Sequence, residues 1–291
     1  MTHVRKAVIL AAGYGSRLLP ATKAIPKEMI PLVDKPAIQY CVEEAVGAGL
    51  SQIIIVTSAG KRSIEDYFDR HSDLEAMLTA KGDTERLAEI ERLHTMADFV
   101  FVRQARQNGL GDAVRTARAA VHEEPFVLFL PDDIVLGDPS PTQELIQTYE
   151  KYSASVIAVE TVPPSETGSY GIVAGEEVDA RTTKLSMLVE KPAPSVAPSN
   201  LAIVGRYLLT PGVFDAISNT EPGYGGEIQI TDALQRMADT EGMYAYRFTG
   251  QRFDTGRPLG LLKASIAIAL SRKDIAPGLA EYLRSLKLPE A

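Results

Sequence analysis

Apolar, strand-like runs alternate with helical patterns through the first half of the chain. "KAVIL" (6–10) and "QIIIVTS" (52–58) are typical of buried strands, and a helical pattern over 36–50 separates them. Further helices and strands follow, ending in "PFVLFLPDDIVL" (125–136). Continuous apolar strands separated by helices indicate a parallel sheet covered on both faces. The sequence therefore predicts an α/β fold with a mostly parallel central sheet and helices on both faces.

The second half has shorter strand patterns, which are separated by Pro and Gly turns and not by long helices. It predicts a mixed region built onto the same sheet. Residues 69–98 are highly charged and helix-favouring, which predicts an exposed helical insertion. We expect one domain, 1–291, divided into 1–135 with the insertion, 136–257, and C-terminal helices over 258–291.

Composition limits the classes of function. The formal net charge of −8 argues against nucleic acid or an anionic membrane as a partner. Cys41 is the only cysteine, so an intrachain disulfide and a cysteine-based zinc site are excluded. The four histidines are scattered and form no cluster. The N-terminus lacks a signal-peptide pattern, and the apolar runs are too short or too charged to span a membrane, so we expect a cytoplasmic protein.

The stretch "VILAAGYGSRLLPATKAIPKEMIPL" (8–32) carries an unusual combination of glycines and cations. Gly13 and Gly15 resemble part of a dinucleotide fingerprint, but Leu18 stands where its third glycine belongs. The glycines let backbone N–H groups approach an anion, and Arg17 can grip phosphate oxygens. Lys27 stands between two prolines, which predicts a stiff, extended segment. A plain turn with solvated cations is the alternative, but the combination favours phosphate binding.

Two groups of carboxylates follow predicted strands. Asp132 and Asp133 in "LPDD" suit a hard cation such as Mg²⁺, and strand alternation predicts that only one of them faces the site. Asp254 in "RFDTG" is a second candidate ligand. Turn-forming carboxylates explain "LPDD" equally well when that segment is taken alone.

Two further stretches can bind polar ligands. In "VEKP", Glu190 could accept hydrogen bonds from substrate hydroxyls and Lys191 could meet a phosphate, although an exposed ion pair is the plainer interpretation. Alternation predicts that these two side chains lie on opposite faces unless the following proline bends the chain. "QNGLGDA" (107–113) offers backbone N–H groups before a helix, and the amide of Gln104 could read the edge of a base.

Taken together, these motifs resemble the sugar-nucleotide pyrophosphorylase family. The stretch from 10 to 40 is similar to the family's activation motif, and "LPDD", "VEKP", "SNLAIVGRYLLTP", "GGEIQITDA" and "FDTG" follow in the family's order and spacing. The resemblance covers about residues 4–270. The insertion at 69–98 fits the members that use UTP, whereas the related thymidylyltransferases generally lack it. Tyr14 and Ser16 are small departures, because "AGYGSR" replaces the more usual "AGLGTR".

The resemblance implies a nucleotidyltransferase with a Rossmann-like core and a mixed, mostly parallel sheet. Its reaction would convert UTP and α-D-glucose 1-phosphate to UDP-glucose and pyrophosphate, with Mg²⁺ as cofactor. It also implies a homo-oligomer, a dimer or a tetramer. Thymidylyl transfer from dTTP and a non-catalytic regulatory subunit are the alternatives, and Leu18 argues against an NAD-dependent oxidoreductase.

The resemblance also assigns roles to residues of this chain. The implied catalytic residues are Arg17, Lys27, Asp132 and Lys191. The implied nucleotide contacts are Ala11, Ala12, Gly13, Gly15, Glu28, Gln104, Gly109, Leu110 and Gly111. The implied sugar-phosphate contacts are Gly171, Glu190, Lys191 and Asn200, and the implied metal ligands are Asp132 and Asp254.

Overall fold

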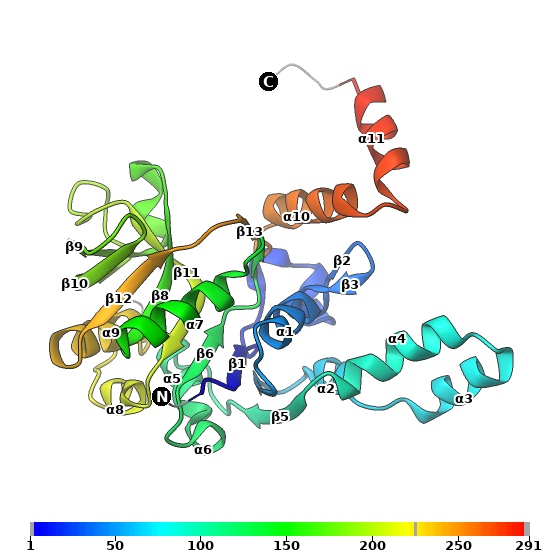
Figure 1. Cartoon of the computed structure of the whole chain (residues 1–291), viewed down its shortest axis with the longest axis horizontal. Helices are drawn as coiled ribbons and strands as arrows, with labels where there is room; N and C mark the ends of the chain where they lie inside the picture. The colour runs from blue at the N-terminus through cyan, green and yellow to red at the C-terminus, as the bar shows by residue number, and fades with distance from the viewer. Residues whose placement is uncertain (1–2, 224–225, 288–291) are drawn as a thin grey trace.

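The computed structural model describes residues 3–223 and 226–287, and within them a nine-stranded sheet forms the centre (Figure 1). Its strands, in the order in which they lie side by side, are β5 (Asp98–Arg103), β4 (Gln52–Thr57), β1 (Lys6–Leu10), β6 (Phe126–Phe129), β11 (Leu201–Leu209), β8 (Ser155–Thr161), β12 (Met243–Arg247), β10 (Thr182–Glu190) and β9 (Gly171–Glu177). The strands of the first half, β5, β4, β1 and β6, are parallel. Antiparallel pairs join β11 to β6 and β8, and β10 to β12 and β9. The predicted mixed α/β sheet is confirmed.

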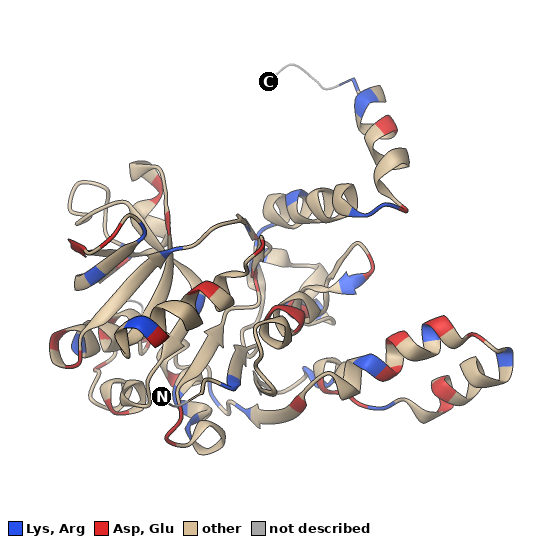
Figure 2. Cartoon of the chain, in the orientation of Figure 1, with Lys and Arg blue, Asp and Glu red and all other residues tan. Residues whose placement is uncertain are grey.

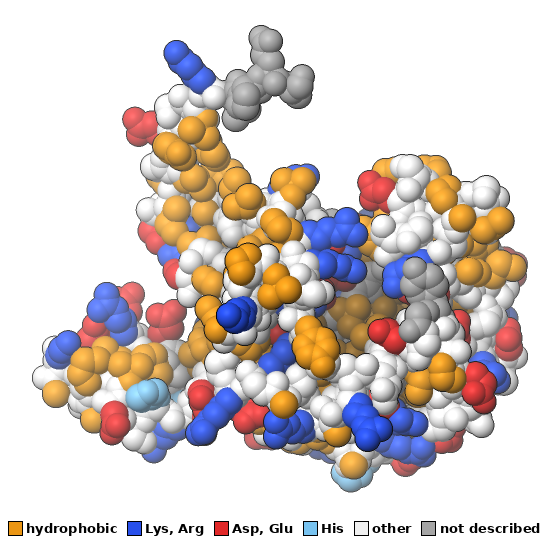
Figure 3. All heavy atoms as spheres, turned by 180° about the vertical axis from the view of Figure 1, so that it is seen from behind, with side chains coloured by type: hydrophobic (Ala, Val, Ile, Leu, Met, Phe, Trp, Pro, Cys, Tyr) orange, Lys and Arg blue, Asp and Glu red, His pale blue; other side chains and the backbone are white. Residues whose placement is uncertain are grey.

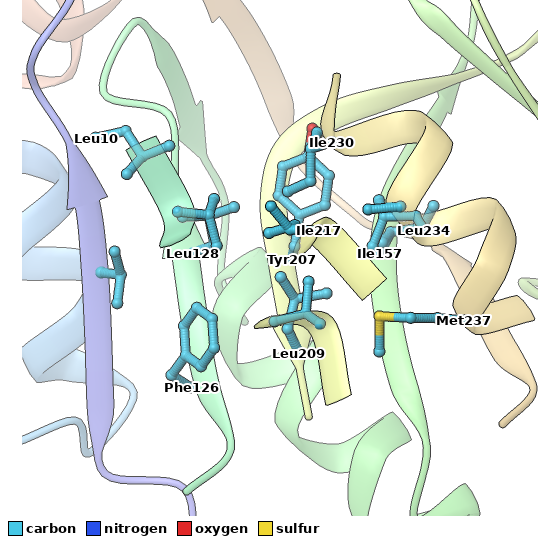
Figure 4. Packing of buried hydrophobic residues seen from close by; sticks show 14 of the residues in the cluster. Leu10, Phe126, Leu128, Ile157, Tyr207, Leu209, Ile217, Ile230, Leu234 and Met237 are labelled. Carbon is cyan, nitrogen blue, oxygen red and sulfur yellow. The ribbon is translucent and has the colours of Figure 1, made fainter. Parts of the chain in front are cut away.

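Helices cover both faces of this sheet. On one face lie α1 (Ala37–Gly47), α7 (Pro141–Tyr152) and α10 (Pro258–Ser271), and on the other α5 (Leu110–Thr116), α8 (Gly212–Ser218) and α9 (Ile230–Thr240). Alternation along β1 explains the two cores, because Val8 and Leu10 pack on the α8–α9 side while Ala7 and Ile9 pack on the α1 side. Figure 4 shows the α8–α9 side, where Leu128 of β6 lies in the same cluster as helix residues. Burial on both faces fixes the sheet on which the site is built.

One predicted strand is broken into two. The run 125–136 forms β6 and then β7 (Asp133–Leu136), which leaves the main sheet and pairs with β13 (Gln251–Asp254). Leu130 N still donates to Gly205 O, but Asp133 N turns back to Leu130 O at 3.1 Å across Pro131. The break places Asp132 in a turn at the end of β6, beside β13.

A predicted helix is also broken. The helix expected at the "QNGLGDA" stretch forms as two short helices, α5 and α6 (Arg118–Val121), separated by Ala117. Ala117 O accepts hydrogen bonds from both Ala120 N and Val121 N, which is the shared bonding typical of a tightened helical turn.

The charged insertion is a helical hairpin that projects from the body (Figure 1). It consists of α3 (Ser72–Lys81) and α4 (Thr84–Thr95), and it follows α2 (Arg62–Phe68). Gly82, with a φ of 69°, ends α3, and the Asp83 side chain accepts a hydrogen bond from Arg86 N to cap α4. Figure 2 shows acidic and basic residues interspersed along it. The predicted helical, charged character of this segment is confirmed.

The C-terminal segment forms α10 and α11 (Ala276–Ser285), and α11 extends away from the body (Figure 1). No described residue of α11 is buried. Residues 1–2 and 288–291, which the predicted domain includes, lie outside the described residues. Among the helices that the structure describes, none combines the length and apolar character that crossing a bilayer requires.

Candidate active site

Two cavities adjoin at the carboxyl ends of the parallel strands. The first cavity, of about 420 Å³, is lined by the glycine loop after β1 and the loop after β5. The second cavity, of about 200 Å³, is lined mainly by residues of the second half of the chain. Leu110, Leu130 and Asp132 line both cavities, so the two form one continuous cleft. The glycine loop and the "PDD" turn therefore converge, as expected for an α/β sheet.

The glycine loop has a shape that requires glycine at position 15. Gly15 has a φ of 69°, and a Cβ atom there would lie 3.0 Å from Lys27 Cβ. Its carbonyl accepts a hydrogen bond from Thr22 Oγ1 at 2.8 Å. A Cβ atom at Gly13, by contrast, would meet nothing within 4 Å, so the backbone there is open to a ligand. Arg17 follows in a 3₁₀ turn and lines the second cavity.

Lys27 lies in a 3₁₀ turn, not in the extended segment that its flanking prolines predicted. Met29 N donates to Pro26 O and Ile30 N donates to Lys27 O, so the backbone bonds within the turn. The Lys27 ammonium reaches across the cleft to Asp132 Oδ2 at 2.6 Å. Burial alone would lower the pKa of Lys27, but the charges of Asp132 and Glu28 outweigh it and raise that pKa. Burial alone would raise the pKa of the partly buried Asp132 carboxyl, but Lys27 holds that pKa below its usual value.

Glu28 has a place different from the one that the resemblance implied. Its carboxylate is 1% exposed and bonds the Lys61 ammonium at 2.8 and 3.0 Å. Burial raises the pKa of Glu28 and lowers the pKa of Lys61, although each charge favours the other. Glu28 lies behind Lys27 and Asp132 and does not line the first cavity. Its contacts are those of a support for the turn that carries Lys27.

The structure brings most of the predicted nucleotide contacts to the first cavity. Six of them line it: Ala12, Gly13, Gly15, Gln104, Gly109 and Leu110. Ala11 is fully buried and Gly111 N donates to Ile228 O at 2.8 Å, so neither lines the cavity. Gln104 Nε2 donates to Asp112 Oδ2 at 2.9 Å, which orients the amide.

Asp132 and Asp254 both lie beside Gly256 and close to each other. A Cβ atom built at Gly256 would lie 2.8 Å from Asp132 Oδ2 and 3.0 Å from Asp254 Oδ1. Thr255 N also donates to Asp132 O at 2.7 Å, which ties the β13 turn to the "PDD" turn. Two converging carboxylates fit Mg²⁺, which takes one or two protein carboxylates and leaves its other positions to water and phosphates. Among the described residues, no set of three or more His, Cys, Asp or Glu side chains could hold a metal.

Asp133 has partners that separate it from this pair. Its Oδ2 accepts from Gly205 N at 2.9 Å, and its Oδ1 accepts from Arg252 Nε at 2.6 Å. Asp132 bonds Lys27 in the cleft while Asp133 is held by β11 and β13. The expectation that only one of the two aspartates faces the site is not met, because both line the second cavity; they differ in their hydrogen-bond partners.

Glu190, Lys191 and Gly171 meet at the second cavity. Lys191 has a φ of 45°, and this left-handed conformation ends the strand alternation that would have separated the two side chains. Lys191 Nζ lies 3.0 Å from Glu190 Oε1, and Thr231 Oγ1 donates to Glu190 Oε2 at 2.6 Å. A Cβ atom at Gly171 would lie 2.9 Å from Ile203, so glycine keeps this corner open. The corner combines a cation with hydrogen-bond acceptors.

Asn200 is the predicted sugar contact that the structure does not place on the cavity. Its amide Nδ2 donates to Val162 O at 3.2 Å, and Val162 N donates back to Asn200 O. This pairing holds the start of β11 against the end of β8.

Sequence reasoning missed several residues of the cleft. Gln107 lines the first cavity and bonds Ala12 O, and Thr231 and Arg252 line the second. A signal for Arg252 was present, because a residue two positions before Asp254 in a strand lies on the same face. Gln107 and Thr231 lie within the quoted stretches "QNGLGDA" and "GGEIQITDA", but the sequence does not single them out, because their contacts are with the distant residues Ala12 and Glu190.

The fold and the cleft define a class: α/β proteins that hold phosphate-bearing ligands between cations and carboxylates at the carboxyl edge of a sheet. The sequence model of the nucleotidyl transferase family matches residues 6–270. The chain belongs to that family.

Individual relatives agree over the whole chain. It is 46% identical over 288 residues to UTP–glucose-1-phosphate uridylyltransferase 2 of Staphylococcus saprophyticus subsp. saprophyticus, covering 99% of this chain and 100% of that protein. The structure resembles a UTP-bound UGPase from Acinetobacter baumannii with a TM-score of 0.90, at 40% identity and covering 98% and 100% of the two chains. It also resembles a UDP-glucose pyrophosphorylase complexed with UDP-glucose, with a TM-score of 0.85, 42% identity, and 93% and 100% coverage. The predicted resemblance to sugar-nucleotide pyrophosphorylases is confirmed.

Proposed function

We propose that this chain transfers UMP from UTP to α-D-glucose 1-phosphate, forming UDP-glucose and pyrophosphate. One observation carries the proposal: a cavity beside the glycine loop and a cavity beside Glu190 and Lys191 meet at Asp132. Two anionic substrates can therefore be held side by side, which is the main requirement of this reaction. Full-length similarity to a uridylyltransferase, and to structures with UTP and UDP-glucose bound, supports the choice of substrates.

The chemistry needs no nucleophile from the protein. A phosphate oxygen of glucose 1-phosphate attacks the α-phosphorus of UTP, and the bond from that phosphorus to the oxygen bridging to the β-phosphate breaks. Pyrophosphate leaves with the electron pair of that bond. The protein supplies position and charge stabilisation. Arg17 and Lys27 act on the triphosphate, and Lys191 acts on the sugar phosphate.

The first cavity takes the nucleotide. The backbone of Ala12, Gly13 and Gly15 faces UTP, and Gly109 and Leu110 lie beside the uracil and ribose, whereas Ala11 and Gly111 do not line this cavity. Gln104 faces the base with an amide that Asp112 has already oriented. This orientation favours a single hydrogen-bonding pattern, which suits recognition of one kind of base.

Mg²⁺ is the cofactor that we propose, held by Asp132 and Asp254. When bound, it neutralises charge on the phosphate oxygens. The two carboxylates converge on Gly256, and Lys27 lies at 2.6 Å from one of them, so cation and carboxylates act on the same phosphates. The second cavity takes the sugar, with Glu190 and the open corner at Gly171 facing its hydroxyls. Asn200 acts on this pocket only through β11, given its bonds to Val162.

The experiment is a panel of nucleoside triphosphates against sugar 1-phosphates, with Mg²⁺ and detection of pyrophosphate. We expect release only when a nucleotide and a sugar phosphate are both present, with UTP and glucose 1-phosphate the best pair. Weaker turnover with dTTP is expected too, because a ring methyl changes binding by only about 1–3 kcal/mol. Release with UTP alone, or none with any pair, would contradict the proposal, and the absence of release with every pair would favour the regulatory alternative.

We also propose that the chain forms a homo-oligomer through its C-terminal helices. α10 exposes a stripe of apolar side chains: Leu259, Leu262, Ile266 and Leu270. Figure 3 shows apolar side chains along both C-terminal helices. The spacing of the stripe is that of one helix face, and a contiguous exposed apolar face marks an interaction site. The cytoplasmic location stays a prediction.

A further inference from the structure

Arg252 on β13 has an unusual set of contacts beside the cleft. Its side chain is 10% exposed and lies between two carboxylates. Nε and Nη2 lie 2.6 and 2.5 Å from Asp133 Oδ1, and Nη1 donates to Glu160 Oε1 at 2.5 Å. The guanidinium also lies 5.2 Å from the centre of the Tyr170 ring, with Nη1 at 3.4 Å from the Tyr170 hydroxyl. One side chain thus joins β13, β7, β8 and the segment before β9.

Two of the contacts of Arg252, Asp133 and Tyr170, are sequence neighbours of residues with proposed roles. Asp133 directly follows Asp132, and Asp254 lies two positions after Arg252 on the same strand. β13 and β7 pair in register at Asp254 and Asp133. One proposed metal ligand, Asp254, is in this two-stranded ladder, and the other, Asp132, directly precedes it. Arg252 connects that ladder to β8 through its bonds to Asp133 and Glu160.

The contact with Tyr170 leads to the other substrate. Tyr170 directly precedes Gly171, and its carbonyl accepts a hydrogen bond from Lys191 N at 2.9 Å. This hydrogen bond fixes the residue whose left-handed conformation turns the Lys191 side chain toward the second cavity. The position of the Tyr170 ring is therefore linked to the corner that receives the sugar phosphate.

Arg252 also lines the second cavity, so it could be a phosphate ligand itself. Its bonds argue for another role. Two carboxylates already neutralise the guanidinium and occupy its three nitrogens, whereas Arg17, on the same cavity, has no carboxylate partner among the described residues. A guanidinium held on several sides fixes geometry more than it attracts an anion.

We propose that Arg252 is a positioning residue that couples the Asp132–Asp254 pair to the sugar-phosphate corner at Tyr170 and Lys191. The inference rests on the proposed function. Residues that hold metal ligands in place typically change metal affinity or activity by about 10–100-fold when they are substituted. Arg252 adds a link to the second substrate, so two separable properties should change together while nucleotide binding in the absence of metal does not.

The test is Arg252→Lys, which keeps the positive charge but loses the planar fork that reaches three partners. Mn²⁺ binding is measured by electron paramagnetic resonance in the presence of α,β-methylene-UTP, which cannot react. The KM for glucose 1-phosphate is measured separately. We expect the Kd for Mn²⁺ and the KM for glucose 1-phosphate each to rise about tenfold or more. The Kd for the analogue without metal should stay within about twofold of wild type. Wild-type values for both properties, or an equal loss of analogue binding, would overturn the proposal.

Arg5→Lys is the matched control, because Arg5 also grips one carboxylate with two nitrogens, at Glu124 and far from the cleft. It should change neither property. If Arg252→Lys fails to fold, Glu160→Gln tests the same connection by removing only the charge on β8. We expect Glu160→Gln to raise the Kd for Mn²⁺ and the KM for glucose 1-phosphate less than Arg252→Lys does. Wild-type values of both would overturn the proposal. Mn²⁺ binding reports on Arg252 even without turnover, whereas an inactive wild-type protein would contradict the proposed function instead.

Discussion

Lys27 and Asp132 are 105 positions apart in the chain, yet their side chains are in contact across the cleft, where they link the segment after the glycine loop to the turn after β6. Asp132→Asn removes the charge that Lys27 and a metal would share while keeping the shape of the side chain. We expect turnover to fall about 100-fold or more, which is typical for loss of one preorganised charge-stabilising group. The melting temperature should change little, and Asp179→Asn, an exposed aspartate on the surface, is the control. Near-normal turnover would remove Asp132 from the reaction.

Lys191 is the cation that we assign to the sugar phosphate, and its loss should affect that substrate most. Lys191→Ala is expected to raise the KM for glucose 1-phosphate about tenfold or more, because a hydrogen bond to a charged group contributes about 1.5–3 kcal/mol. The KM for UTP should change much less. Lys184→Ala, at an exposed lysine on β10, the strand that ends directly before Lys191, is the control. Equal changes in both KM values would show that Lys191 serves the whole cleft.

At the scale of elements, the buried pair of Glu28 and Lys61 joins the turn carrying Lys27 to the loop before α2. Lys61→Met leaves the Glu28 carboxylate buried without a partner, and we expect the free energy of unfolding to fall by about 3–5 kcal/mol. The double variant with Glu28→Met should recover most of this loss, because an apolar pair of similar volume needs no charge compensation. Urea denaturation of the three proteins measures the difference. Equal stability of the two variants would contradict the pairing.

The same pair predicts a pH dependence with a definite sign. Burial raises the pKa of Glu28 above the value of about 4.3 of an unfolded chain, so the folded state holds its proton more tightly. That contribution to stability is fully present below the unfolded pKa and is lost as the pH rises through the folded pKa. Without Lys61, the pKa of Glu28 rises further, because Lys61 favours the charged carboxylate. The loss in free energy of unfolding that Lys61→Met causes should therefore be larger at pH 8 than at pH 5. A deficit independent of pH would show that lost packing, not charge, is its cause.

The elements that sequence predicts well are those set by local periodicity. β1 and β4 are buried on both faces, and their continuous apolar pattern was sufficient to predict them. The break between β6 and β7 was not predictable, because it depends on Leu130 N finding Gly205 O, 75 positions further along the chain. The turn at Lys27 and the left-handed backbone of Lys191 are set by such distant contacts too.

The site shows the same division. Motif residues such as Gly13 and Gln104 line the cleft because loops at the carboxyl ends of adjacent strands converge in any sheet of this type. Arg252 and Thr231 gain their roles only from partners elsewhere in the chain, Asp133 and Glu190. The sequence therefore predicts where ligands bind better than it predicts which side chains hold the ligand-binding groups in place.

At the scale of the whole molecule, the apolar stripe on α10 is the feature that the single chain leaves uncovered. Leu259 is 64% exposed and Leu262 61%, and both lie on a helix whose other face packs against the body. Burial of such side chains contributes about 1.5–3 kcal/mol each, so a second copy covering the stripe would be stabilised by it.

The double variant Leu259→Glu/Leu262→Glu places two charges in that stripe, and we expect it to sediment as a monomer when the wild-type chain sediments as a dimer or larger assembly. Charges buried without partners oppose association, while the same charges in water do not oppose folding of the chain. Val196→Glu, at a residue 71% exposed in the loop before β11, should leave the assembly unchanged. Analytical ultracentrifugation over a range of protein concentrations makes the measurement. A wild-type monomer at all concentrations, or a double variant that still assembles, would contradict an interface on α10.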